Sequence, residues 1–198
     1  MSQDVMMHAE DFRAGRALGV DHRKVGMWLF IASEVMFFGG LLATYLHYKY
    51  LLGFPEASGL NIVAVGINTT ILLTSSLTVV LGLSSIRAGK RGQLSIFLLL
   101  TIGLGLAFLG GQALEFSHLY GEGVTLTSSV FGSSFFTLTG FHGLHVVAGV
   151  IWAIIVLVRG LRRDFTAERN MGVEVFGLYW HFVDIVWIML FTLIYLIP

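Results

Sequence analysis

A segment near the carboxyl end of the chain, Tyr179 to Trp187, places two ionisable side chains in otherwise apolar surroundings. These are His181 and Asp184, which stand three residues apart. Residues at this spacing share one face of an α-helix, so we expect both side chains to project in the same direction. Facing lipid, the Asp carboxylate would cost on the order of 2.5 to 3.5 kcal/mol. The pair therefore predicts a position inside a protein, where it would hold helices together or, alternatively, help to bind a metal ion.

Further ionisable residues lie within other apolar stretches, and such groups in a membrane protein are functional candidates. Glu34 stands about ten residues, or about 15 Å, into its stretch, near the middle of a hydrocarbon core about 30 Å thick. His142 and His145 share a face of another stretch, and Glu115 lies near the outer end of a third. Together these residues predict a buried polar cluster of Glu34, Glu115, His142, His145, His181 and Asp184.

The chemistry of this cluster has several interpretations. Glu34 could form a structural hydrogen bond to an imidazole, tune or relay protons, or contact a lipid or ligand. The two histidine-containing pairs could hold helices together, or their imidazoles could ligate haem, copper or zinc. A di-haem cytochrome b would usually present matched histidines on two facing helices. Here the histidines are clustered with acids instead.

The elements that would position these side chains are five apolar stretches, each close to the roughly 20 residues that a helix needs to span a membrane. The composition agrees, with a mean hydropathy of +0.82, 12% charged residues and only two prolines. We therefore predict an all-α membrane protein, a bundle of five transmembrane helices in a single domain over 25–198, preceded by a cytoplasmic N-terminal arm over 1–24. The expected spans are 25–48, 60–86, 94–116, 131–158 and 175–197.

The distribution of basic residues predicts the orientation of this bundle. Of the 12 Lys and Arg residues, all but Lys49 fall in the N-terminal arm and in the second and fourth connections. Because translocated loops are depleted in Lys and Arg, we expect the N-terminus to be cytoplasmic and the C-terminus to lie outside.

Several functional classes are disfavoured by what the sequence lacks. It has no cysteine, which excludes disulfides, c-type haem attachment, thiolate copper centres and iron–sulfur clusters. It contains no phosphate-binding glycine motif, and a net charge of zero argues against nucleic acid. The sequence has no convincing internal repeat, so it does not indicate a duplicated transporter.

Four blocks of sequence carry a resemblance to a known family. They are 26–38 (GMWLFIASEVMFF), 111–116 (GQALEF), 132–146 (GSSFFTLTGFHGLHV) and 179–187 (YWHFVDIVW). With a weaker match around Asn61 and Asn68, they cover all five stretches in order. The sequence resembles subunit III of the haem–copper respiratory oxidases, the cytochrome c oxidase polypeptide III family, in its short five-helix form.

The resemblance implies a non-catalytic accessory subunit of an aerobic terminal oxidase in a bacterial plasma membrane. Such a subunit has no catalytic residue, cofactor or metal site of its own, and haem and copper are expected in partner subunits. It would pack beside the catalytic subunit I and other oxidase subunits, stabilise the catalytic subunit, support its proton uptake and bind phospholipid. Glu34, His142, His145, His181 and Asp184 match motif residues of the family.

The sequence also departs from longer members, which carry two additional helices that form a lipid-filled cleft with the other five. Phe116 stands where the family is expected to have tyrosine. The electron donor, cytochrome c or quinol, is not distinguished by this chain, because the donor binds other subunits.

Two other classes stay open at this point. A proton-coupled transporter or channel would use Glu34 and Asp184 as a relay, although no broken helices are evident. A b-type cytochrome would use paired histidines as haem ligands.

Overall fold

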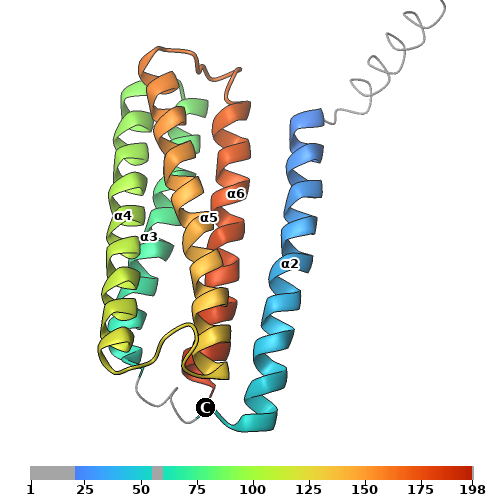
Figure 1. Cartoon of the computed structure of the whole chain (residues 1–198). Coiled ribbons are helices and arrows are strands. Elements are labelled where there is room, and N and C mark those ends of the chain that lie inside the picture. The colour runs from blue at the N-terminus through green and yellow to red at the C-terminus, as the bar shows by residue number, and fades with distance from the viewer. Residues whose placement is uncertain (1–20, 55–59, 198) are drawn as a thin grey trace, which may run out of the picture.

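The computed structural model describes residues 21–54 and 60–197, in which five long helices are found (Figure 1). They are α2 (His22–Leu52), α3 (Ile62–Arg87), α4 (Arg91–Gly121), α5 (Val130–Leu161) and α6 (Met171–Leu190). The last helix continues as a π-helical segment, η2 (Phe191–Leu196). All five, with α6 and η2 taken together, are long and apolar enough to cross a membrane. The predicted class, an all-helical chain with five candidate spans, is therefore confirmed.

Capping side chains explain where two helices begin relative to the predicted spans. α2 starts at His22 rather than Val25, because the Asp21 carboxylate accepts a hydrogen bond from the Arg23 N–H at 2.8 Å. α3 starts at Ile62, after Asn61, whose side-chain oxygen accepts from the Ala64 N–H at 3.1 Å. Residues 1–20 of the predicted N-terminal arm lie outside the described residues.

Four of the helices form a closed ring, and the fifth lies against its outside. α3 packs on α4, α4 on α5, α5 on α6, and α6 returns to α3, while α2 contacts mainly α5 and α6. In Figure 1 the blue α2 stands at the side of the other four helices. We call the end of the bundle with Gly53, Glu122 and Ile197 the distal end, and the opposite end, with Asp21 and Gly89, the proximal end.

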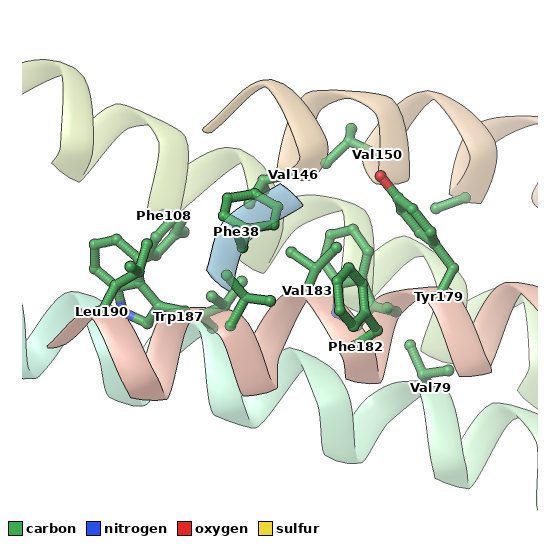
Figure 2. Close-up of a cluster of buried hydrophobic side chains, with 14 of the residues drawn as sticks. Phe38, Val79, Phe108, Val146, Val150, Tyr179, Phe182, Val183, Trp187 and Leu190 are labelled. Carbon is green, nitrogen blue, oxygen red and sulfur yellow. The ribbon is translucent and has the colours of Figure 1, made fainter. Parts of the chain in front are cut away.

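Burial differs most between α6 and α2. Over the most apolar 18-residue segment of each span, 56% is buried within the chain in α6 with η2, against 11% in α2. The buried residues of α2 are Ile31, Phe38 and Tyr45, which recur every seven positions and so form one narrow stripe. Figure 2 shows the centre of the core, where Phe38 meets side chains of the four-helix ring. Most of α2 therefore faces lipid or another protein.

The tryptophans of α6 hold the ring together. The Trp180 Nε1–H donates to the Ser75 hydroxyl and the Trp187 Nε1–H to the Thr69 hydroxyl, each at 2.9 Å, so both rings are tied to α3. Trp180 is fully buried and lies between two glycines, Gly105 of α4 and Gly149 of α5. A Cβ at Gly149 would lie 2.5 Å from the indole ring. Glycine at these positions lets the backbones approach closely enough to enclose Trp180.

α2 buries little apolar surface. Charged side chains attach both of its ends to the other helices. At the proximal end Glu174 of α6 accepts from Lys24 of α2 at 2.6 Å and from Arg87 of α3 at 3.2 Å. At the distal end the Lys49 ammonium of α2 donates to the Ile197 carbonyl at 2.5 Å and to the Leu193 carbonyl at 3.3 Å. A cation is favourable there, since the last carbonyls of a helix have no partner within it.

Gly149 and Gly140 offer a direct test of the packing around Trp180. We expect Gly149→Ala to lower stability by about 1 to 3 kcal/mol, because the added methyl group displaces the indole ring. Gly140→Ala, on the same helix, should leave stability nearly unchanged, since nothing lies within 4 Å of a Cβ there. The measurement is the thermal unfolding midpoint in mild detergent, followed by far-ultraviolet circular dichroism. Equal midpoints for the two variants would contradict this account.

Candidate functional site

Glu34 and His145 form the central polar contact between α2 and α5. The His145 Nε2 atom lies 3.2 Å from the Glu34 Oε2 atom, and each side chain is 18% exposed. The sequence places Glu34 on the face of α2 that carries Ile31 and Phe38, because residues three and four apart share a helix face. The structure thus brings together two of the predicted site residues, more than a hundred positions apart in the chain.

The hydrogen bonds of the imidazole limit how this pair can be connected. The His145 Nδ1 atom lies 2.7 Å from the Phe141 carbonyl oxygen, which can only accept, so this contact is a hydrogen bond when Nδ1 carries the hydrogen. A hydrogen bond between Nε2 and Oε2 then needs a hydrogen on one of these two atoms. The pair can therefore share a proton between two helices.

The surroundings of His145 restrict its movement. The Tyr179 hydroxyl of α6 donates to the His145 carbonyl oxygen at 2.9 Å. The Phe38 ring stands edge-on to the imidazole, with ring centroids 5.0 Å apart. The proton-holding pair is therefore framed by α2, α5 and α6, and its geometry depends on the packing of all three helices.

His181 makes a second contact, between α6 and α3. Its Nδ1 atom lies 2.5 Å from the Ser76 hydroxyl oxygen. The same residue lines a groove of about 340 Å³ between α2 and α6, whose other walls are almost entirely apolar. His181 therefore has one ring nitrogen engaged inside the chain and lies at the edge of a groove that opens to the outside.

Asp184 and His142 lie deeper than the other predicted residues. Asp184 is 3% exposed and His142 is fully buried, and none of their side-chain oxygens or nitrogens has a hydrogen-bond partner among the described residues. The imidazole of His142 stacks on Trp187, with centroids 4.9 Å apart, and meets the edge of Phe108. His142 thus lies among aromatic rings, whereas Asp184 lies near the Ser76 side chain, whose hydroxyl contacts His181.

Glu115 forms a third contact, in the distal part of the bundle. The Tyr195 hydroxyl donates to its Oε2 atom at 3.1 Å, while its Oε1 atom is buried without a partner among the described residues. Tyr195 belongs to the π-helical segment η2. Four of the six predicted residues thus take part in three direct contacts, and His142 and Asp184 occupy two buried positions.

Sequence reasoning missed the partners that make these contacts. Ser76 and Tyr195 are hydroxyl residues in apolar stretches and resemble many others in this sequence. Glu174 and Lys49 could have been proposed from the sequence as contacts between helix ends, because each is a charged residue at the end of an apolar stretch. Within the described parts of the chain, no three His, Cys, Asp or Glu residues come together in a way that could hold a metal ion.

The comparisons with known proteins agree with one another. The family model of cytochrome c oxidase subunit III matches residues 3–197. Cytochrome bo(3) ubiquinol oxidase subunit 3 of Pseudomonas aeruginosa is 40% identical over 173 residues, covering 86% of this chain and 83% of that protein. Cytochrome c oxidase subunit 3 of Bacillus subtilis is 39% identical over 175 residues, with 87% and 84% covered.

A relative from Thermostichus vulcanus, also a cytochrome c oxidase subunit 3, extends the match along the chain. It is 37% identical over 196 residues, which cover 92% of this chain and 94% of that protein. These proteins match through the helices that carry the candidate site. The resemblance stated from the sequence is therefore confirmed: the chain belongs to the cytochrome c oxidase subunit III family, as a multi-pass membrane protein and an accessory subunit of a haem–copper oxidase.

Proposed function

We propose that this chain stabilises the catalytic subunit I of an aerobic terminal oxidase and supports its proton uptake while electrons pass to oxygen. The family match over residues 3–197 carries this proposal. The chain itself catalyses no step, and haem and copper belong to the partner subunits. The relatives bear names of both quinol and cytochrome c oxidases, so the proposal covers both classes of electron donor. Family membership supports this role over a transporter or a b-type cytochrome.

The Glu34–His145 pair has the chemistry that the proton-related part of this role requires. It holds one proton on partially exposed side chains, 18% for each partner, within the apolar span of α2. The pair is net neutral with this proton bound, and releasing the proton leaves a Glu34 carboxylate beside a neutral imidazole, a charge that the partial exposure of both side chains makes less costly than full burial. We propose that the pair buffers protons near subunit I and also fixes α2 to α5.

The setting of the proposed complex is the plasma membrane of a bacterium. The distribution of Lys and Arg supports a cytoplasmic N-terminus and an external C-terminus, because the basic residues gather at the proximal end of the helices. Lys49 is the exception at the distal end, and its ammonium is engaged by the Leu193 and Ile197 carbonyls. Its position therefore has a structural reason that is independent of topology.

Two substitutions at Glu34 separate its structural role from its proton-related role. Glu34→Gln keeps a side chain that can hydrogen-bond His145 but cannot release a proton. We expect it to assemble normally, and to shorten the active lifetime of the oxidase during turnover by about tenfold, less than the roughly 100-fold or greater effect of a group that transfers protons in the reaction itself. Glu34→Leu removes both functions and should also lower the amount of chain that co-purifies with subunit I.

The measurements are subunit stoichiometry after purification in mild detergent and the decay of oxygen consumption under continuous turnover. Glu122→Gln is the control, because this exposed acid lies at the distal end and contacts only His118 among the described residues. If Glu34→Gln assembles and survives turnover as the unmodified chain does, Glu34 has no proton-related role. If Glu34→Leu also behaves normally, the structural role is wrong as well.

The absence of cysteine makes the orientation straightforward to test. Single cysteines at Ala88, in the connection between α3 and α4, and at Thr127, between α4 and α5, fall on exposed residues at opposite ends of the bundle. We expect a membrane-impermeant maleimide to label Thr127→Cys in intact cells and Ala88→Cys only after the membrane is opened. The reverse pattern would overturn the proposed topology.

A further inference from the structure

Most of the buried polar atoms that lack a partner among the described residues belong to three side chains, one each on α4, α5 and α6. They are both oxygens of Asp184, both ring nitrogens of His142 and the Oε1 atom of Gln112. Exposure of these residues is 3%, 0% and 5%. Buried polar atoms in native proteins nearly always have a hydrogen-bond partner, either in the protein or in ordered water. Several unpartnered atoms in one place therefore point to a buried ligand.

Three aromatic contacts place these side chains close together. The rings of Phe108, His142 and Trp187 contact one another in a triangle, with centroids 4.8, 4.9 and 5.9 Å apart. Asp184 precedes Trp187 by three residues, so it shares that face of α6 and lies about one turn nearer the proximal end. Gln112 follows Phe108 by four residues and lies about one turn nearer the distal end. His142 thus lies between Asp184 and Gln112 in depth.

The packing of α5 on α6 fixes the offset between His142 and Asp184. Gly149 faces Trp180 and His142 faces Trp187, so the two antiparallel helices advance by the same number of residues between these contacts. Asp184 is therefore offset from His142 by about one turn, or about 4.5 Å along the axis. A water molecule that accepts or donates at about 2.8 Å on each side joins polar atoms about 5 Å apart. The offset suits such a bridge.

The other polar groups around this position are engaged elsewhere. The Trp187 indole N–H donates to Thr69 at 2.9 Å. Ser76, which lies near Asp184, has its hydroxyl 2.5 Å from the His181 Nδ1 atom. Within the described residues, no third His, Cys, Asp or Glu joins the pair to form a metal site. Water is therefore the ligand that fits Asp184 and His142.

We propose that an ordered internal water molecule binds between Asp184 of α6 and His142 of α5. In its neutral form an imidazole has one nitrogen that donates and one that accepts, and a carboxyl group can also do both. Water, which donates two hydrogen bonds and accepts two, can therefore serve either nitrogen of His142 and either oxygen of Asp184. The bridge joins two helices of the ring and does not involve α2. It is thus independent of the proton-related role proposed for Glu34.

A density map of the complete oxidase, at a resolution that shows ordered water elsewhere in its membrane domain, tests the site directly. We expect a water peak about 2.7 to 3.2 Å from one Asp184 oxygen and from one His142 nitrogen. Asp184→Asn should keep this peak, because the amide still offers an acceptor and gains donors. A direct contact between Asp184 and His142, or no peak between them, would overturn the proposal.

Paired substitutions test the same bridge by stability. Asp184→Leu and His142→Phe each leave one buried polar group without its bridge, so we expect each to lower the thermal unfolding midpoint of the full chain in mild detergent by about 2 to 4 °C. The double variant should lose less than the sum of the two single losses, because neither polar group is left.

Tyr45→Phe, combined with Asp184→Leu, is the matched control. Tyr45 also buries an unpartnered hydroxyl oxygen, but its ring lies 6.0 Å from the Lys49 ammonium at the distal end. The effects of this control pair should add, as expected for sites that share no partner. Losses that also add for Asp184 and His142 would contradict the bridge, even if both single variants are destabilised.

Discussion

The attachment of α2 is the constraint on which the candidate site depends. This helix buries a single stripe of apolar residues, so packing alone holds it weakly. Polar contacts fix it at three depths: Lys24 to Glu174, Glu34 to His145, and Lys49 to the last carbonyls of the chain. Polar contacts are well suited to this purpose in a bilayer, where apolar surfaces gain little by leaving lipid. The middle contact is also the one that we propose as a proton buffer, so attachment and the proposed proton chemistry share the same atoms.

The other four helices are held together in a different way. Trp180 and Trp187 each direct an indole N–H toward a hydroxyl of α3, and Trp187 contacts Phe108 of α4 and His142 of α5. The bulk of Trp180 fills the space that Gly105 and Gly149 leave free. His142 lies inside this aromatic packing, where a charged imidazole would have no hydrogen-bond partner. The centre of the ring is therefore held by aromatic packing and indole hydrogen bonds, and α2 is attached to its outside.

The sequence was sufficient to predict the helices, because long apolar stretches between basic connections have few structural alternatives in a membrane. It also predicted Glu34, since a carboxyl group in mid-span needs a partner. It did not reveal which imidazole that partner would be, because the choice among His142, His145 and His181 depends on how α5 and α6 are rotated about their axes. That rotation depends on Trp180 fitting against Gly105 and Gly149, a three-dimensional match that spacing along the chain does not encode.

The connections of α2 also impose an order on biosynthesis. Its three partners, on α5, on α6 and at Leu193 and Ile197, all follow α3 and α4 in the chain, and Glu34 precedes His145 by 111 positions. α2 must therefore enter the membrane with an unpaired carboxyl group and wait there while three more helices are inserted. An ionised carboxyl group left in the bilayer during that interval would be costly. α2 therefore gains its polar contacts only after α5 and α6 are in place, although it precedes both in the chain.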